Sequence, residues 1–416
     1  MSKTAIIGGG SSGLAAAIFI KTNDPSAAVT IFDRMDRVGK KLLATGNGRC
    51  NLSNTAASDF GSNNVKKYAE HYHGADRSFA VNALSKFGIN ELRDFLLSLG
   101  IPTTFENDKL FPLSLNASTV VDVLRLKCEQ LGVIFKLSQQ IDSIKNGSAK
   151  FIISGEAFDN VIVATGGKSQ ENLGSNGSGY KLLEAFGHKC TKLYPSITQI
   201  RTETEFVRQL KGLKIDADCK LYLDNKPIAE QFGQVLFADY GLSGPPIFFI
   251  SRYASVYGDR CKISLDLMPN YSMNDVFDLV KNVANNPFCD DLTLENLLTP
   301  IINKRIGQVI IKHCGYRLST KVNNITDRDI KQICAGLKAF ELKVTGVKGY
   351  NIAQVTAGGI MTDKFDYNTM MSKLKPRLYA IGEVLDVDGD CGGYNLQWAF
   401  SSAFSAAKNI TTGKHR

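Results

Sequence analysis

The chain has 416 residues, 44% of them hydrophobic, and a formal net charge of +9, which excludes a disordered chain and allows two or three domains with a core in each. Its nine cysteines form no CxxC pair and show no repeated spacing, so we expect buried thiols and neither a metal site nor a disulfide framework. No apolar run of about 18 residues and no signal-peptide pattern occurs, which predicts a cytoplasmic protein without membrane contact.

The first motif is a strand followed by a glycine-rich turn and a helix. The chain begins MSKTAIIGGGSSG, in which Thr4 to Ile7 predicts a buried strand. In such a turn Gly8 allows the tight bend, Gly10 lets the backbone approach a pyrophosphate, and Gly13 lets the helix pack on the strand. The amides and the dipole at the start of this helix favour phosphate groups.

The helix is predicted to continue to Ile20, and a second strand follows at Val29 to Phe32. Asp33 comes directly after it, 20 residues beyond Gly13, where a carboxylate can accept hydrogen bonds from an adenosine ribose. The glycine triplet alone also fits an ordinary strand-to-helix turn, but the acid at this distance favours a dinucleotide. Since FAD and NAD share the ADP group, other motifs must separate them.

A second glycine-rich segment, RMDRVGKKLLATGNGRCNLSN, follows Asp33 at once. Its glycines give the backbone freedom, while Lys40, Lys41 and Arg49 supply positive charge. A loop of this composition can wrap a pyrophosphate or the edge of a flavin.

Helix and strand patterns then alternate up to about residue 164. Apolar residues at helical spacing predict one helix over Phe79 to Leu99, ended by Gly100, and another over Ser118 to Leu131. Strands are predicted at Val133 to Leu137, Lys150 to Ser154 and Phe158 to Ala164, and a further glycine turn follows at Gly166 and Gly167. This alternation predicts a layered α/β domain with a mainly parallel sheet.

The pattern changes in the middle of the chain. Short alternating runs between about 190 and 269 predict an antiparallel β subdomain, and 270–338 predicts short helices with polar connectors. We therefore predict a discontinuous dinucleotide-binding domain at 1–189 and 351–416. A β subdomain is predicted at 190–269 and 339–350, with a helical subdomain at 270–338.

Most of the excess positive charge lies in the segment 299–350, which holds ten Lys or Arg against three acids. Such a surface either is simply solvated or docks a polyanion such as RNA, since phosphate contacts dominate nucleic-acid affinity. Few aromatic residues are interleaved there, so the sequence does not support recognition of single strands by stacking.

The C-terminal motifs separate FAD from NAD. LYAIGE, at Leu378 to Glu383, places an acid after a strand, and GGYN, at 392–395, opens a last helix that is predicted to run to Ile410. The acid can bind the ribityl hydroxyls of FAD. The helix amides can face N1 and C2=O of the flavin ring, where reduced flavin carries negative charge.

Six long stretches resemble one family of proteins. GKKLLATGNGRCNLSN, VIVATGGKS, GSNGSGYKLLEAFGH, VLFADYGLSGPP, AQVTAGGI and LYAIGEVLDVDGDCGGYNLQWAFSSA are similar to the bacterial NAD(P)/FAD-dependent oxidoreductases known as YhiN or BaiN-like flavoproteins. The resemblance runs from residue 4 to about 408. It implies a Rossmann-like FAD domain made from both chain ends, with an inserted antiparallel β subdomain and a small helical subdomain.

The sequence departs from the family pattern at three places outside the FAD motifs. Ala238-Asp239 stands where Thr-His is usual, Cys391 where Thr is usual, and Asp108-Lys109 where Gly-Arg is usual. A role for a histidine before Gly241 therefore does not carry over to this chain.

The candidate catalytic residues are Cys50, Arg49 and Asn51. Cys50 is either a proton donor or redox thiol beside the flavin, or a packed loop thiol, and no partner cysteine follows it within a few residues. The residues predicted to bind the cofactor are Gly8, Gly10, Ser12, Gly13, Asp33, Arg34, Lys40, Lys41, Thr45, Gly46, Asn47, Gly48, Ala164, Thr165, Gly166, Gly382, Glu383, Gly392, Gly393, Tyr394, Asn395 and Leu396.

Two residues at the start of the last helix each have two possible roles. Asn395 binds the cofactor or caps the helix, while Tyr394 shields the flavin ring or packs against other side chains.

Two further patterns do not indicate a metal site. The acids at 386, 388 and 390 alternate as in a calcium loop but lack its other ligands. His71 and His73 lack a third ligand and are predicted to be surface residues.

The leading hypothesis is an FAD-dependent oxidoreductase in which NADH or NADPH binds transiently and the reduced flavin passes a hydride to an activated C=C bond. The family resemblance implies uridine in large-subunit ribosomal RNA as one substrate, with dihydrouridine as its product. The alternatives are an oxidase or reductase of a small amine or enone, and a non-catalytic RNA-binding protein that retains FAD. The sequence does not indicate the oligomeric state.

Overall fold

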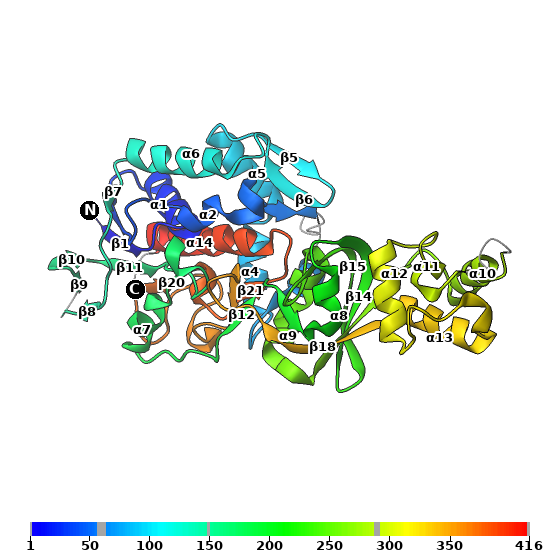
Figure 1. Ribbon diagram of the computed structural model, residues 1–416. Helices are drawn as coiled ribbons and strands as arrows, with labels where there is room; N and C mark the ends of the chain where they lie inside the picture. The colour runs from blue at the N-terminus through cyan, green and yellow to red at the C-terminus, as the bar shows by residue number, and fades with distance from the viewer. Residues whose placement is uncertain (1, 56–63, 148–149, 287–291, 414–416) are drawn as a thin grey trace. The chain divides into compact units, whose positions relative to one another are not determined.

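The chain forms two compact units, Met1–Pro195 with Tyr350–Arg416 and Ser196–Gly349 (Figure 1). The computed structural model describes residues 2–55, 64–147, 150–286 and 292–413. Within them no helix is both long enough and apolar enough to cross a membrane.

The first unit is built on a parallel sheet in the order β20-β11-β1-β2-β7. β1 and β11 are central and almost entirely buried, which explains their nearly continuous apolar sequences. The strands are β1 (Lys3–Ile7), β2 (Ala28–Phe32), β7 (Ile134–Lys136), β11 (Asn160–Val163) and β20 (Leu378–Ala380).

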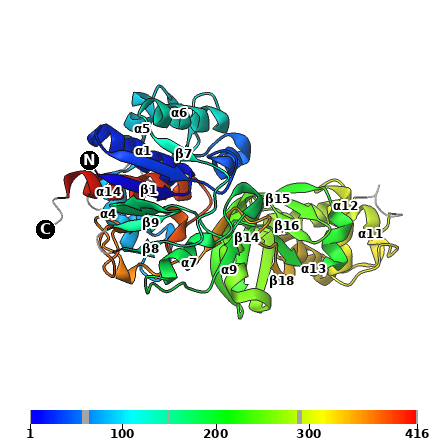
Figure 2. The same ribbon diagram turned by 90° about the vertical axis from the view of Figure 1, so that its left-hand side faces the viewer.

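Both ends of the chain contribute to the core of this unit. Helix α1 (Ser11–Asn23) packs between α6 (Ala117–Gln130) and α14 (Tyr394–Thr412), as Figures 1 and 2 show. Small residues of α1, with Ala15, Ala16 and Ala17 fully buried, allow this close packing.

The prediction of one helix over 79–99 is wrong. The segment forms α4 (Phe79–Lys86) and α5 (Ile89–Ser98), with a break at Phe87 and Gly88. The carbonyl oxygen of Phe87 accepts hydrogen bonds from Ser401 Oγ at 2.6 Å and Gln397 Nε2 at 3.0 Å, both on α14. These buried contacts take the place of the hydrogen bond that the Phe87 carbonyl oxygen would accept from the amide four residues later in a continuous helix. The spacing of apolar residues alone could not show them.

The first unit also contains shorter elements that position its loops. They are α2 (Lys40–Leu43), the 3-10 turn η1 (Thr45–Gly48), β3 (Ser53–Asn54), α3 (Asn64–Ala69), β4 (Tyr72–His73), β5 (Thr103–Glu106), β6 (Lys109–Pro112), β8 (Lys145–Asn146), β9 (Phe151–Ile153), β10 (Glu156–Phe158), α7 (Ser178–Glu184), β19 (Val355–Ala357), η9 (Gly382–Val384) and β21 (Asp388–Gly389), while β12 (Tyr194–Ser196) lies at the boundary.

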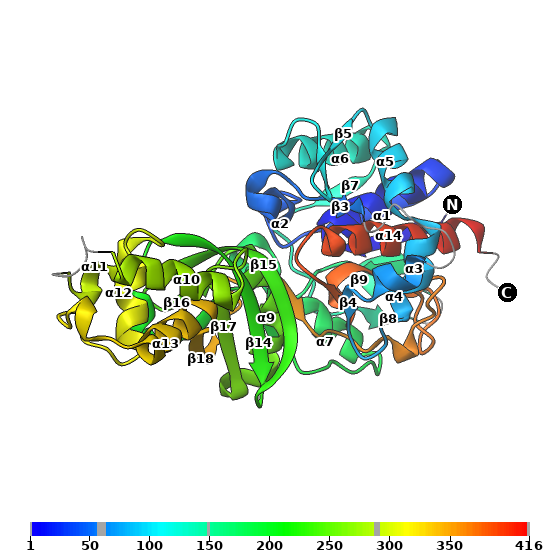
Figure 3. The same ribbon diagram turned by 90° about the vertical axis from the view of Figure 1, so that its right-hand side faces the viewer.

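The second unit is a closed antiparallel barrel with helices packed on its core. The strand order is β13-β16-β15-β14-β17-β18. Its strands are β13 (Ile200–Thr202), β14 (Lys214–Leu223), β15 (Lys226–Ala238), β16 (Gly241–Ser243), β17 (Cys261–Asp266) and β18 (Phe340–Val347). The helices are α8 (Thr204–Val207), α9 (Pro245–Tyr257), α10 (Met273–Ala284), α11 (Leu294–Leu297), α12 (Lys304–His313) and α13 (Asp327–Lys338), and the last four gather together in Figure 3.

The predicted fold class is confirmed, because a parallel Rossmann-like sheet uses strands from both chain ends and the inserted segment contains an antiparallel barrel and helices. The three-part subdivision with the boundaries given above remains a prediction.

Candidate cofactor site

The turn between β1 and α1 is shaped by positions that have no side chain. A Cβ on Gly13 would lie 1.9 Å from the carbonyl oxygen of Gly8, so only glycine fits there. A Cβ on Gly10 would meet nothing within 4 Å, and no side chain caps α1 at this residue. Open space therefore adjoins the first amides of α1, including that of Ser12, as an anion site requires.

Asp33, at the end of β2, is fixed beside this turn. One carboxylate oxygen accepts from Gly9 N at 2.7 Å and the other from Met35 N at 2.8 Å. Burial raises the pKa of Asp33, although the two amide bonds oppose that shift. Each oxygen keeps acceptor capacity for a hydroxyl group. Arg34 turns elsewhere and donates to Glu171 O at 3.0 Å.

Glu383 joins two segments that are far apart in the sequence. Lys41 Nζ lies 2.8 Å from Glu383 Oε2, and Thr356 N donates to Glu383 Oε1 at 2.8 Å. Both members of the ion pair are mostly buried. The carboxylate is thus held from both sides, and its remaining lone pairs can accept from a ligand hydroxyl.

Thr356 is a residue of this site that the sequence analysis did not single out. Its hydroxyl oxygen accepts from Lys168 N at 2.8 Å and Ser169 N at 3.0 Å. A Cβ on Gly167 would lie 2.6 Å from Thr356 Oγ1 and 2.7 Å from Glu383 Oε1. Thr356 therefore links Glu383 to the turn after β11, which includes the predicted Ala164, Thr165 and Gly166. The sequence signal was the AQVTAGGI motif, whose threonine was given no role.

The loop after Gly39 holds most of the other predicted cofactor residues. Three of them adopt left-handed backbone in succession, with φ of 57° at Gly46, 55° at Asn47 and 83° at Gly48. Thr45 Oγ1 donates to Leu42 O at 2.7 Å, and Lys40 pairs with Asp36 at 2.5 Å. Local contacts therefore hold this loop, and Lys41 is the cation that reaches Glu383.

Cys50 is fully buried, and burial raises the pKa of its thiol to about 12. Four further cysteines are buried, three are half-buried, and Cys289 lies outside the described residues.

The side chains of Arg49 and Asn51 contact different parts of the unit. The Arg49 guanidinium pairs with Glu106 and lies over the Phe111 ring at 4.6 Å. The Asn51 amide points to the start of α14, and in the orientation that satisfies both contacts it donates to Ser53 O at 2.8 Å and accepts from Gly393 N at 3.2 Å.

The start of α14 is held by several side-chain contacts. Asn395 bonds Gly389 in both directions, at 2.9 and 2.8 Å, and no side chain caps the helix. Tyr394 is buried, and Leu396 packs partly buried against the core. Asn54 donates to Gly392 O at 2.9 Å, whereas its own oxygen is buried without a partner among the described residues.

The prediction that His71 and His73 are surface residues is wrong for His73, whereas His71 is partly exposed. His73 is 4% exposed and His71 is 36% exposed. The two oxygens of Asp390 lie 3.0 Å from His71 Nδ1 and 2.7 Å from His73 Nε2. The cause is the antiparallel pairing of β4 with β21, which places Asp390 beside both imidazoles. Among the described residues no His, Cys, Asp or Glu cluster is arranged to hold a metal.

The basic segment 299–350 uses several of its cations internally. Arg305 donates to the carbonyl oxygens of Gln209 and Lys211, and Lys312 to Gln209 Oε1. Lys338 pairs with Asp266 at 2.6 Å, and Lys348 lies 3.8 Å from the centre of the Tyr240 ring. These contacts fix the positions of several cations of the segment, and the Lys338 charge is offset by Asp266.

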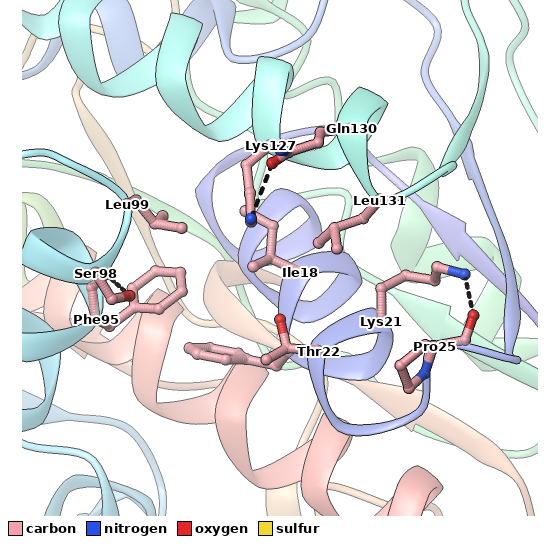
Figure 4. Close-up of a pocket in the computed structure, with 11 residues that line it drawn as sticks. Ile18, Lys21, Thr22, Pro25, Phe95, Ser98, Leu99, Lys127, Gln130 and Leu131 are labelled. Atoms are coloured by element: carbon pink, nitrogen blue, oxygen red, sulfur yellow. Dashed lines mark hydrogen bonds between the residues drawn. The ribbon is translucent and has the colours of Figure 1, made fainter.

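A surface hollow of about 710 Å³ lies at the other end of α1 from the glycine turn. Figure 4 shows that its lining comes from the second half of α1 and from the facing residues of α5 and α6. The ammonium groups of Lys21 and Lys127 are bound to Pro25 O and Gln130 Oε1. The hollow thus adds no reactive group to the site.

These features fit FAD. The open space at Gly10 suits a pyrophosphate, the acceptors of Asp33 and Glu383 suit sugar and ribityl hydroxyls, and the buried oxygen of Asn54 suits a donor such as a ring N–H.

The sequence matches the HI0933-like protein Rossmann domain family over residues 2–409. It is 33% identical to a 3-dehydro-bile acid delta(4,6)-reductase of Clostridium scindens over 98% of both chains. It is also 29% identical to a ribosomal RNA dihydrouridine synthase of Haemophilus influenzae, over 99% of this chain and 98% of that one.

Two solved structures share the fold at a TM-score of 0.50 and 15% identity. An open flavocytochrome c3 fumarate reductase is matched over 99% of this chain and 78% of its own, and a quinol fumarate reductase of E. coli over 99% and 70%. At this identity the likeness concerns the fold alone.

Proposed function

The chain belongs to the HI0933-like Rossmann family of FAD-dependent oxidoreductases, and from this membership we propose that it reduces a C=C bond conjugated to a carbonyl group, with NADH or NADPH as the source of electrons. The name of the bile acid reductase describes reduction of such a bond, and the name of the dihydrouridine synthase describes reduction of the uracil ring. Bound FAD would supply the hydride chemistry.

The chain's own residues would bind and orient the cofactor. The amides at the start of α1 would hold the pyrophosphate, Asp33 the adenosine ribose, and Glu383 a ribityl hydroxyl. The positive end of α14 would stabilise negative charge on the reduced ring. Thr356 and Lys41 would keep Glu383 in place.

The catalytic candidates differ in strength. Arg49 and Asn51 can orient groups beside the loop, because both are partly exposed and polar. Cys50 is the weaker candidate, because its thiol is fully buried and its raised pKa keeps it neutral at physiological pH.

A small enone is the substrate class that we favour, and the observation that carries it is the 33% identity to the bile acid reductase over 98% of both chains. Ribosomal uridine is the second candidate, supported by the 29% identity to the dihydrouridine synthase of Haemophilus influenzae and by the basic segment 299–350.

One experiment addresses both the reaction and the substrate. The purified protein is reduced without oxygen by NADH or NADPH, and the bleached flavin is then mixed with a steroid enone or with ribosomal RNA that lacks dihydrouridine. We expect the enone to restore the oxidised spectrum, with product two mass units heavier. Reoxidation by RNA alone, with dihydrouridine detected by mass spectrometry, would support the second substrate. A flavin that neither nicotinamide reduces would contradict the proposed reaction.

A further inference from the structure

Asp390, His71 and His73 form a buried cluster of titratable groups that the proposed reaction does not use. The Asp390 side chain is 9% exposed and touches one imidazole nitrogen with each oxygen. Burial alone would raise the pKa of Asp390, but the two imidazole contacts prevail and hold it below its usual value. The carboxylate is therefore ionised, and a proton on either imidazole would offset its charge.

This cluster is attached to the first turn of α14. The His71 ring stacks on the Tyr394 ring, with centroids 4.5 Å apart and planes 21° apart. Tyr72 OH donates to Tyr394 O at 2.8 Å, and Asn395 holds Gly389, the residue before Asp390. Several contacts thus fix the cluster beside the helix end that is proposed to face the reduced flavin.

The other groups around the cluster would not replace it as a proton acceptor. Burial raises the pKa values of the Tyr68, Tyr72, Tyr394 and Cys391 side chains, so these groups stay neutral between pH 5 and 8. The charged groups whose fields reach these side chains are Asp108 and Lys109, and Asp386 and Asp388 are the other acids of the same segment. Imidazole is the group that ordinarily gains a proton in this range.

We propose that His71, Asp390 and His73 form a proton-holding triad that takes up one proton from solvent when negative charge develops at the N-terminus of α14. This rests on the proposed function, in which that charge belongs to reduced FAD. The hydride from NAD(P)H carries both electrons and one proton to the flavin, and the triad's proton is additional. It adds one positive charge to the triad, and partly exposed His71 provides the contact with solvent. The three residues are positioning residues, since they act through α14.

The test is the pH dependence of the flavin midpoint potential, measured by spectroelectrochemistry on the FAD-containing protein from pH 5.5 to 8.5. Wild type is expected to show a steeper fall of the potential with pH than His71→Gln or Asp390→Asn, because the variants lose the extra proton. His71→Gln keeps the test usable if Asp390→Asn does not fold, since its side chain is partly exposed.

His188→Gln is the matched control. The His188 ring also stacks on an aromatic ring, that of Phe365, at 4.3 Å and 17°, but its Nε2 contacts Ser372 Oγ at 2.9 Å and not a carboxylate. Burial lowers the pKa of His188 to about 4, so it stays neutral in the measured range and should keep the wild-type slope.

Equal slopes in wild type and His71→Gln, with FAD bound to both, would overturn the inference and leave the proposed function intact. A protein that binds no FAD at all would overturn both.

Discussion

The glycine turn at Gly8 to Gly13 is shaped by positions that have no side chain, whereas the Glu383 end of the same unit is held by contacts between side chains and backbone. At the first end a Cβ on Gly13 would collide with backbone, and at the second Glu383 is held by Lys41 and Thr356. The first arrangement is local in sequence. In the second, Lys41 and Glu383 are 342 positions apart. Steric limits therefore determine the shape of the glycine turn, and a network of polar contacts determines the position of Glu383.

The largest effect should come from Gly13→Ala. Its Cβ would lie 1.9 Å from the Gly8 oxygen, so backbone must move, at a cost of about 3 kcal/mol in the free energy of unfolding. Denaturant unfolding of the FAD-free protein measures this.

Gly10→Ala is the matched control, because its Cβ meets nothing within 4 Å. It should leave the stability of the FAD-free protein within about 1 kcal/mol of wild type and weaken FAD binding, as measured by flavin fluorescence. Equal destabilisation by both variants would contradict the steric account of this end.

Thr356→Val should have the next largest effect. It removes the acceptor of the Lys168 and Ser169 amides, and leaving buried donors unpaired costs about 2 kcal/mol. Thr356→Ser keeps the hydroxyl and should retain most of the stability and FAD affinity. If valine and serine behave alike in thermal unfolding, the hydroxyl does not hold the turn.

Glu383→Gln should lower FAD affinity about tenfold, or about 1.4 kcal/mol, because it removes the charge opposite Lys41 while keeping the shape of the side chain. Glu171→Gln serves as control, since Glu171 contacts Arg34 through its backbone oxygen, which the substitution keeps. Calorimetric FAD titrations that give the same affinity for both variants would argue against Glu383 as a ligand.

The smallest effect concerns the Cys50 thiol. In the folded chain its pKa is about 12, against 9.0 ordinarily, so above pH 9 the unfolded chain binds fewer protons. Its contribution to stability is therefore full below pH 9 and declines as the pH rises toward 12. Iodoacetamide should spare Cys50 in folded protein at pH 8 and label it in denaturant, as mass spectrometry can show. Rapid labelling of the folded protein would show a reactive thiol instead.

Short-range patterns predicted the fold class, which the sheet topology confirms, and the local candidate residues, whose cofactor role stays a prediction. The strand, the turn and Asp33 lie within one βαβ unit, and each has a characteristic spacing. Glu383 was predicted as a cofactor residue because an acid after a buried strand is a recognisable motif.

What sequence reasoning missed depends on contacts between distant segments. The role of Thr356 follows from its bonds to a turn 188 positions away, and the break at Phe87 follows from bonds to α14. Asp390 contacts both His71 and the buried His73 because of a strand pairing of two residues on each side, which is too short to give a periodic signal.

The position of β20 in the sheet has a consequence for synthesis on the ribosome. β11 pairs with β1 on one side and with β20, which begins at Leu378, on the other. Until that strand leaves the exit tunnel, the nascent chain carries an unpaired apolar edge and lacks both Glu383 and α14. An unpaired edge invites association with other chains. The proposed cofactor site can therefore form only after β20 and α14 have been synthesised, and a chain that stops before them would be a target for chaperones and proteases.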